Sequence, residues 1–115
     1  QNIIGYYTLS SGGLKREDIP EQFKKRIPHH YSIPVILLGR LAIDNNHKRK
    51  GYGALLLIDA LKRALHTSEN SIGAMAVIVD PINELAFSFY KKYGFIELED
   101  SGKMFLPMQV IKKLP

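Results

Sequence analysis

The 115-residue sequence contains no cysteine. It can therefore form neither a disulfide framework nor a thiolate metal site, and it has no cysteine nucleophile. Its longest apolar runs, Val35–Leu38 and Ala74–Val79, have the length of strands and are far shorter than the roughly 20 residues that span a bilayer. The chain shows no signal peptide and begins with Gln1, which indicates a processed or trimmed start. We therefore expect a cytoplasmic protein that binds neither a metal nor a membrane.

Positive side chains outnumber negative ones, with 16 Lys and Arg against 11 Asp and Glu and a formal net charge of +5. A bias of this size is compatible with a polyanionic partner, either a phosphorylated cofactor or a nucleic acid. It is also common in proteins that bind neither, so the charge alone leaves the partner open. The length and the ordinary mixture of hydrophobic and charged residues predict one globular domain spanning residues 1–115.

The alternation of apolar and polar residues, punctuated by Gly and Pro, predicts an α/β domain with a mixed sheet. We expect the second helix to begin at an Asn83 N-cap and to end at Gly94. Pro107 inside the last expected strand indicates a sheet edge or a bulge. The apolar stripe of the second helix would be Ile82, Leu85, Ala86, Phe89 and Tyr93. The expected elements are a strand at Ile3–Leu9 stopped by Ser10–Gly13, a short helix within Glu17–Arg26, a strand at Val35–Ile43 buried on both faces, a helix at Gly51–His66, a strand at Ala74–Val79, the second helix, and strands at Phe95–Leu98 and Lys103–Ile111.

A basic loop precedes the first long helix. Lys48, Arg49 and Lys50 stand directly before Gly51 and Gly53. A helix N-terminus offers unpaired N–H groups and a positive dipole end, and glycines let a ligand approach that backbone. Such a turn can cradle a pyrophosphate. It matches neither the P-loop nor the dinucleotide fingerprint, and on its own it also fits a solvated basic loop at a tight turn.

This loop resembles the acetyl-CoA signature of GNAT acetyltransferases, [Q/R]-x-x-G-x-[G/A], with lysine at the first position. Residues 83–95 resemble the second CoA helix of the same family, N-x-x-A-x-x-[FY]-Y-x-x-x-G-F. The resemblance implies a mixed twisted sheet flanked by helices and acetyl-CoA as the cosubstrate. It also implies that Tyr90 protonates the departing CoA thiolate, which a phenol that is protonated at neutral pH can do. From the residues around it alone, a flanking core aromatic is the favoured interpretation of Tyr90. The cofactor-binding residues implied by the resemblance are Leu41, Ala42, Ile43, Lys48, Arg49, Lys50, Gly51, Tyr52, Gly53, Ala54, Asn83 and Phe87.

The run Ile33–Asp44, together with residues 4–9 and 86–95, is similar to one GNAT subgroup, the toxins of bacterial toxin–antitoxin pairs. This similarity implies acetylation of the α-amine of aminoacyl-tRNA, which blocks translation, and a ribbon-helix-helix antitoxin as partner. The chemistry agrees in part: residues 35–43 include no carboxylate to deprotonate a lysine, whereas an α-amine with a pKa of about 7.7–8.0 is already substantially neutral. Two alternatives stay open. The chain could acetylate a small amine or a protein N-terminus, or it could be a truncated, non-catalytic CoA-binding module.

The GNAT fold normally begins with a strand, two helices and a second strand before the segment equivalent to Ile3. We therefore expect that the N-terminal portion is missing and that the Ile3–Leu9 strand is an open edge, suited to a homodimer or another partner. Two basic clusters are candidates for tRNA phosphates, although each also fits an ordinary charged surface. They are Lys15, Arg16, Lys24, Lys25 and Arg26, and Lys48, Arg49, Lys50, Lys91 and Lys92.

Overall fold

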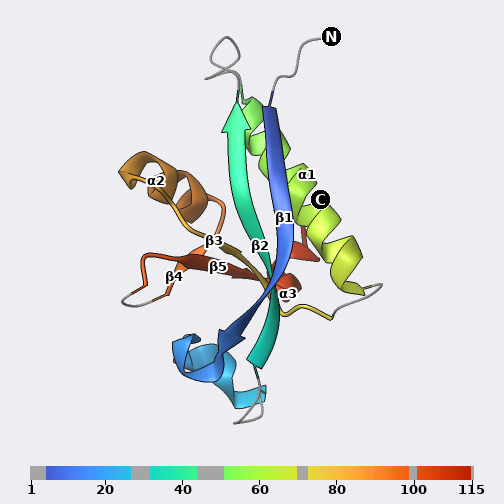
Figure 1. Ribbon diagram of the computed structural model, residues 1–115, viewed down its shortest axis with the longest axis vertical. Helices are drawn as coiled ribbons and strands as arrows, with labels where there is room; N and C mark the ends of the chain where they lie inside the picture. The colour runs from blue at the N-terminus through green and yellow to red at the C-terminus, as the bar shows by residue number, and fades with distance from the viewer. Residues whose placement is uncertain (1–4, 27–31, 44–50, 70–72, 99–100, 115) are drawn as a thin grey trace.

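The computed structural model describes residues 5–26, 32–43, 51–69, 73–98 and 101–114. Within these residues one sheet has the strand order β1-β2-β3-β5-β4, and only β2 and β3 are parallel (Figure 1). This confirms the expected α/β domain with a mixed sheet. The strands are β1 (Gly5–Lys15), β2 (Ser32–Ile43), β3 (Ala76–Val79), β4 (Ile96–Glu97) and β5 (Met104–Pro107). The helices are α1 (Tyr52–Thr67), α2 (Glu84–Lys92) and α3 (Met108–Ile111), with 3-10 turns η1 (Arg16–Asp18) and η2 (Glu21–Arg26).

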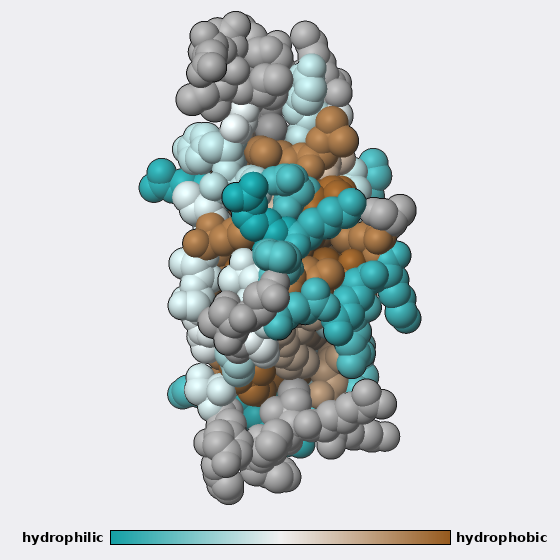
Figure 2. Space-filling model, turned by 90° about the vertical axis from the view of Figure 1, so that its right-hand side faces the viewer, coloured by the Kyte–Doolittle hydropathy of each residue, from teal (hydrophilic) through white to brown (hydrophobic). Residues whose placement is uncertain are grey.

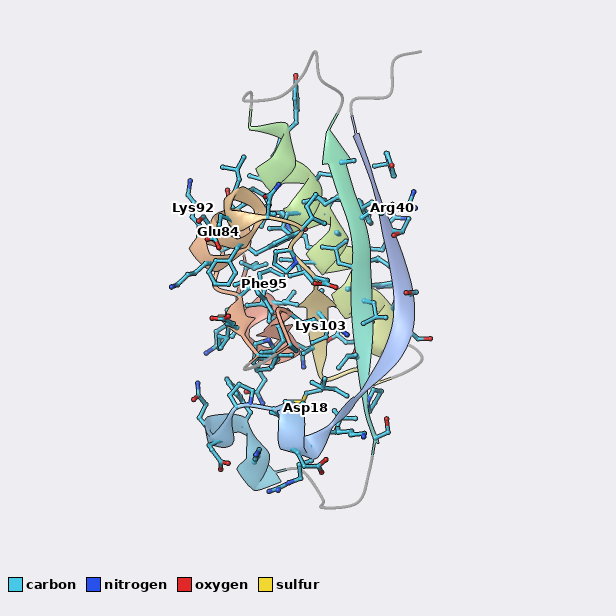
Figure 3. All side chains as sticks on the ribbon, turned by 60° about the vertical axis from the view of Figure 1, so that its left-hand side comes forward. Asp18, Arg40, Glu84, Lys92, Phe95 and Lys103 are labelled. Atoms are coloured by element: carbon cyan, nitrogen blue, oxygen red, sulfur yellow. The ribbon has the colours of Figure 1, made fainter. Side chains whose placement is uncertain are left out.

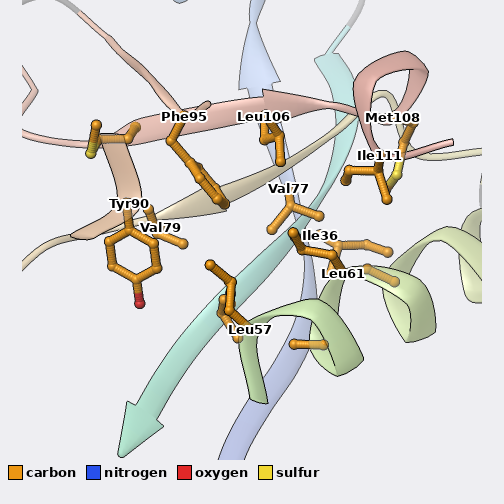
Figure 4. Close-up of a cluster of buried hydrophobic side chains, with 14 of the residues drawn as sticks. Ile36, Leu57, Leu61, Val77, Val79, Tyr90, Phe95, Leu106, Met108 and Ile111 are labelled. Atoms are coloured by element: carbon orange, nitrogen blue, oxygen red, sulfur yellow. The ribbon is translucent and has the colours of Figure 1, made fainter. Parts of the chain in front are cut away.

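The two faces of the sheet are covered by different elements. All three α-helices contribute to the core on one face, where Leu57, Leu61, Tyr90 and Ile111 pack against strand residues such as Val77 (Figure 4). On the other face η2 supplies Phe23, whose ring packs edge-on against Phe105 with 5.2 Å between ring centroids. The sheet is therefore a layer between a helical face and a face covered in part by 3-10 turns.

Helix α1 forms where the apolar period predicts it. Its fully buried side chains are Leu57, Ala60, Leu61 and Ala64, which recur at helical spacing on the side facing the sheet. Apart from Leu55, which is 66% exposed, the exposed side chains of α1 are polar, and Figure 2 shows hydrophilic side chains gathered over this side of the molecule. Packing of this apolar stripe, rather than intrinsic propensity, supplies most of the stability of such a helix.

The expected end of the first strand at residues 10–13 is wrong, because β1 runs on to Lys15. The two glycines lie where β1 and β2 approach closely. A Cβ at Gly12 would lie 3.0 Å from the Leu37 side chain, and one at Gly13 would collide with the Ser32 hydroxyl. Glycine here permits strand pairing rather than a turn.

The expected helix within 17–26 is also different: η1 and η2 are short 3-10 turns, with Ile19 and Pro20 between them. The last expected strand ends at Pro107, and α3 follows. Strand β5 lies between β3 and β4, but β4 pairs only with Met104 and Phe105, so Pro107 has a described strand partner, Ala76, on one side alone, as at a sheet edge. Its φ of −63° suits the residue before a helix. The Met108 N–H donates to the Met75 carbonyl at 2.8 Å, which continues the pairing of β3 and β5 by one residue as α3 begins.

Candidate active site

Strands β2 and β3 diverge beyond a short stretch of pairing, and the term cleft below denotes this separation of their backbones rather than a cavity between side chains. The two strands pair only at Ile36 and Leu37 among the described residues, and beyond this point β2 continues to Ile43 while β3 turns toward α2 (Figure 1). On its other side β2 stays paired with β1 as far as Gly5 opposite Ile43. The backbone groups of β2 that face the cleft from Leu38 onward therefore have no strand partner in the described part of the chain, and they are available to an extended ligand.

A bulge at Gly39 determines which side chains face this cleft region. Thr8 pairs with Arg40 and Leu9 pairs with Leu38, so Gly39 is the extra residue. A Cβ at Gly39 would lie only 2.7 Å from the Thr8 hydroxyl oxygen, so a larger residue there would require the Thr8 side chain to move. Because of the bulge, Leu38 and Leu41 both pack on the helical face. Arg40 lies on the opposite face.

The start of α1 has the geometry of an anion site. Gly51 stands at the N-cap with a left-handed φ of 81°, and among the described residues no other group lies within 4 Å of the position that a Cβ would take. The first turn carries no acidic side chain and has no side-chain cap, so its N–H groups keep their positive field. A Cβ at Gly53 would lie 3.7 Å from the Phe89 ring, so this turn is next to α2. Lys48, Arg49 and Lys50 lie outside the described residues.

Helix α2 begins as predicted at Asn83, whose side-chain oxygen accepts the Ala86 N–H at 2.8 Å. The expected apolar stripe is wrong in its first turn, because Ile82 and Leu85 are 91% and 82% exposed. The residue that α2 buries most deeply is Tyr90. An apolar residue at helical spacing does not by itself indicate which side of a short helix meets the core.

Tyr90 is buried among aromatic rings but keeps its hydroxyl accessible. Its ring lies 5.4 Å from that of Phe89 and 5.2 Å from that of Phe95, centroid to centroid, in edge-on contacts. The hydroxyl points away from Phe95 (Figure 4). It has no hydrogen-bond partner in the described residues, and it is not fully buried. Burial of the ring raises the pKa of the Tyr90 phenol above its ordinary value. The group is therefore a neutral proton donor at physiological pH.

The expected site residues come from three elements that are separate in the sequence, and of these Leu41, Phe87 and Tyr90 belong to or pack against one core cluster. Leu41 and Ala42 come from β2, Gly51, Tyr52, Gly53 and Ala54 from the start of α1, and Asn83, Phe87 and Tyr90 from α2. Ile43 is the last residue of β2, and its backbone pairs with Gly5 of β1. Phe87 is half-buried, and the Lys91 ammonium lies 5.9 Å from its ring centroid.

The first expected basic cluster is only partly available to a polyanion. The Lys24 ammonium pairs with Glu21 at 3.0 Å, and the Arg16 guanidinium donates to the Lys24 carbonyl. The neighbouring groove of about 550 Å³ is lined by Glu17, Asp18, Glu21 and Glu97 among others. The structure says nothing of the side chains of Lys25 and Arg26. Lys91 and Lys92 are exposed on α2.

A polar contact between β1 and α1 has no counterpart in the sequence motifs. The Tyr7 hydroxyl donates to the Asp59 carboxylate at 2.5 Å, and burial together with Asp59 raises the pKa of Tyr7. Nearby, β1, β2 and α1 line a cavity of about 360 Å³, and its lining includes Leu9, Ile36 and Arg63.

In the described part of the chain no helix is long and apolar enough to cross a membrane, and no three His, Asp or Glu side chains converge on a metal position.

Comparison with known proteins identifies related chains. Residues 13–103 match the model of the family described as FR47-like protein. A tRNA-acetylating toxin of Mycobacterium tuberculosis is 36% identical over 93 residues, which cover 81% of this chain and 54% of that protein. A probable toxin TacT of Sinorhizobium fredii is 31% identical over 120 residues, covering 97% and 66%. This chain therefore spans about half to two-thirds of the length of the curated relatives it matches.

Comparison with solved structures identifies toxins as well. A tyrosine-to-phenylalanine mutant of KacT superposes with a TM-score of 0.88 at 34% identity, covering 97% of this chain and 66% of the other. AtaT complexed with acetyl-methionyl-tRNAfMet gives 0.86 at 36% identity, covering 95% and 65%. A tyrosine-to-phenylalanine mutant of the AtaT toxin, bound to the C-terminus of the antitoxin AtaR and to acetyl-CoA, gives 0.75 at 32%, covering 95% and 63%. This chain belongs to the FR47-like family and has the GNAT-type fold.

Proposed function

We propose that this chain is the acetyl-CoA-binding part of an N-acetyltransferase toxin that acetylates the α-amine of aminoacyl-tRNA. The observation that carries the proposal is the cleft between β2 and β3, with the accessible hydroxyl of Tyr90 beside a core of aromatic rings. The named activity of the Mycobacterium tuberculosis relative and the tRNA bound to AtaT support this choice of substrate.

The described residues fit acetyl-CoA, which supplies an activated acetyl thioester. The left-handed turn at Gly51 leaves open space, and the acid-free first turn of α1 presents its amides to a pyrophosphate. In this proposal the backbone of Gly51, Tyr52, Gly53 and Ala54 holds the phosphates together with Lys48, Arg49 and Lys50. The cleft-facing backbone of Leu41, Ala42 and Ile43 pairs with the pantetheine arm, and Asn83 and Phe87 border it.

Tyr90 acts as the general acid. As the neutral α-amine attacks the acetyl carbon, a C–N bond forms and the C–S bond breaks, and the Tyr90 phenol gives its proton to the leaving sulfur. The nitrogen loses one proton to water as the amide forms, and the Tyr90 phenolate takes up a proton from water. The raised pKa keeps the phenol protonated at the pH where the amine is neutral. Solved forms of KacT and AtaT with tyrosine replaced by phenylalanine show that a tyrosine was singled out in both relatives.

The proposed partners are aminoacyl-tRNA as substrate and a ribbon-helix-helix antitoxin, as the AtaR-bound structure of AtaT suggests by analogy. The outer edge of β1, which no described strand covers, can serve a homodimer. We propose the cytoplasm as the compartment, since the substrate is found there.

The test is transfer of label from acetyl-CoA to a mixed pool of charged tRNA, with Tyr90→Phe measured in parallel. Label on aminoacyl-tRNA that Tyr90→Phe abolishes would support both the substrate class and the donor. If the parent chain binds acetyl-CoA but labels only small amines or protein N-termini, the tRNA assignment is wrong.

A further inference from the structure

One side chain of β1 connects the two parts of the proposed acetyl-CoA site. Tyr7 pairs with Leu41 of β2, whose backbone borders the cleft, and both side chains pack on the helical face. Arg40, the residue before Leu41, lies on the side of β2 away from α2 (Figure 3). The Tyr7 hydroxyl donates to the Asp59 carboxylate of α1 at 2.5 Å. The strand proposed for the pantetheine arm and the helix proposed for the pyrophosphate are therefore joined through Tyr7.

This hydrogen bond acts on the start of α1 although it lies some way along the helix. Asp59 lies about two turns after Gly51, or roughly 12 Å along the helix axis. Helix α1 runs without interruption from Tyr52 to Thr67, so it moves as one rod. A shift of Asp59 along the axis therefore shifts the amides of the first turn by the same distance.

Apolar packing alone holds α1 less firmly along its axis. Leu57 and Leu61 pack against the core of the sheet, but apolar contact has no preferred direction, and packed helices can slide over one another by small distances. Next to β1 the packing also leaves the cavity of about 360 Å³ that Leu9, Arg63 and Thr67 help to line. A short hydrogen bond to a charged acceptor is directional, so it fixes the axial position that apolar packing leaves free.

The contact also lies beside the bulge at Gly39. The register of the β1–β2 ladder shifts between Thr8 and Leu9, directly after Tyr7. A bulge disrupts the ladder locally and bends and twists the strand that carries it. The part of the ladder that borders the cleft, residues 40–43 of β2 with their partners in β1, is therefore separated from the rest of the sheet by an irregular step. Tyr7 fastens this part of the ladder to α1.

We propose that Tyr7 and Asp59 are a positioning pair that sets the distance between the two halves of the acetyl-CoA site, and this proposal rests on the proposed function. The pair contacts no substrate and acts through the backbone of Leu41 and the first turn of α1. A ligand that occupies both halves at once binds well only when their separation matches its own length, whereas a ligand in one half is insensitive to that separation. Loss of the pair therefore weakens acetyl-CoA binding and leaves the proton transfer from Tyr90 unchanged once the site is filled.

The test compares acetyl-CoA, which spans both halves, with ADP, which has a pyrophosphate but no pantetheine arm. We expect Tyr7→Phe to raise the Kd for acetyl-CoA about two- to tenfold, the effect of losing one hydrogen bond, and to leave the Kd for ADP at the parent value. The KM for acetyl-CoA rises by the same factor, and kcat is unchanged. Asp59→Ala has the same effect, and the double variant binds acetyl-CoA as each single variant does, because both substitutions remove one shared contact.

Glu69→Ala is the matched control. It removes a carboxylate just after the other end of α1, where Glu69 pairs with Lys112 at 3.9 Å, and it should leave both Kd values at those of the parent. Equal weakening of acetyl-CoA and ADP by Tyr7→Phe, or the same effect from Glu69→Ala, would show general loosening of the fold and overturn the positioning role. The Tm of each variant, measured beside the Kd values, gives the extent of that loosening.

The outcome for the parent chain separates this proposal from the proposed function. If the parent binds acetyl-CoA and acetylates charged tRNA, but Tyr7→Phe binds acetyl-CoA equally well, the positioning pair is wrong and the proposed function stands. A double variant that binds clearly more weakly than either single variant would show that Tyr7 and Asp59 act independently, which also contradicts the pair. A parent chain that does not bind acetyl-CoA overturns both proposals.

Discussion

The ring of Phe95 packs edge-on against the ring of Tyr90, with 5.2 Å between their centroids. The backbone reinforces this contact, because the Phe95 N–H donates to the Tyr90 carbonyl at 3.2 Å. Gly94 between α2 and Phe95 has a φ of 97°, a conformation that few residues other than glycine adopt and that turns the chain back at the end of α2. The orientation of Tyr90 therefore depends on the residue that leads into β4 as well as on α2 itself.

Replacing Phe95 should reduce catalysis through Tyr90. Phe95→Leu removes an aromatic pair that contributes roughly 0.5–1.5 kcal/mol beyond its buried area and lets the Tyr90 ring shift. We expect kcat to fall several-fold while the KM for acetyl-CoA is unchanged. Phe105→Leu is the matched control, since Phe105 is fully buried and packs edge-on against Phe23 on the other face. An equal fall in kcat for both variants would show that general loss of stability is responsible.

Removing the Tyr90 hydroxyl should affect turnover far more than folding. Tyr90→Phe keeps the ring contacts with Phe89 and Phe95 but removes the proton donor. General acid catalysis typically contributes 10²–10⁴-fold, so we expect kcat to fall by about 10²-fold or more, with acetyl-CoA affinity and Tm close to those of the parent. Full turnover by the variant would exclude Tyr90 as the acid.

The pH dependence follows from the same phenol. Burial raises the pKa of Tyr90 above its ordinary value of 10.0, so the donor stays protonated through neutral pH and is lost only as the pH rises beyond that value. The α-amine becomes neutral above a pKa of about 7.7–8.0, so activity should rise across that range, reach a plateau and fall in strong alkali. Tyr90→Phe should lack the alkaline fall. An alkaline fall that is identical in the variant would assign it to another group.

The turn at Gly51 should be sensitive to a side chain. Alanine in the left-handed region costs roughly 1–2 kcal/mol, or about 4–8 °C in Tm per kcal/mol for a small domain. We therefore expect Gly51→Ala to lower Tm and to weaken acetyl-CoA binding, because relieving the strain redirects the amides of α1. Gly102→Ala is a close control: its φ is 75°, and nothing in the described part of the chain lies within 4 Å of its Cβ position. It should lower Tm by a similar amount and leave acetyl-CoA affinity unchanged, and equal loss of affinity in both would argue against a phosphate cradle at Gly51.

Local signals account for the parts of the fold that the sequence predicts well. The apolar period of α1 and the Asn83 cap of α2 depend on residues within one or two turns, so they can be recognised without a structure. The continuation of β1 through Gly12 and Gly13 depends instead on Leu37 and Ser32 of the partner strand. Only the folded sheet shows that these glycines relieve a close approach.

The candidate site also combines features that the local sequence predicts with features that depend on the folded chain. The family signatures draw attention to Gly51 and Tyr90, but the aromatic surroundings of Tyr90 depend on Phe95, which lies outside α2. The strand at residues 35–43 was expected to be buried on both faces, and this holds only up to Leu38. After the bulge at Gly39 the apolar period changes phase, so that Arg40 is exposed. A one-residue change of phase inside an apolar run has no local marker except the glycine itself.

The brief pairing of β2 and β3 has a consequence for the cleft. Two residue pairs join these strands in the described chain, and the Met75 N–H donates to the Pro34 carbonyl just before them. Beyond this pairing, β2 and β3 are connected through the core cluster, in which Leu38 and Val79 pack with Leu57 of α1 and Tyr90 of α2. The distance between β2 and β3 beyond Leu37 therefore depends on the volume of these core side chains more than on backbone hydrogen bonds. Larger or smaller side chains at these buried positions would widen or narrow the separation of the two strands. Such substitutions would change the size of acyl group that fits, without any change in the residues proposed to contact acetyl-CoA.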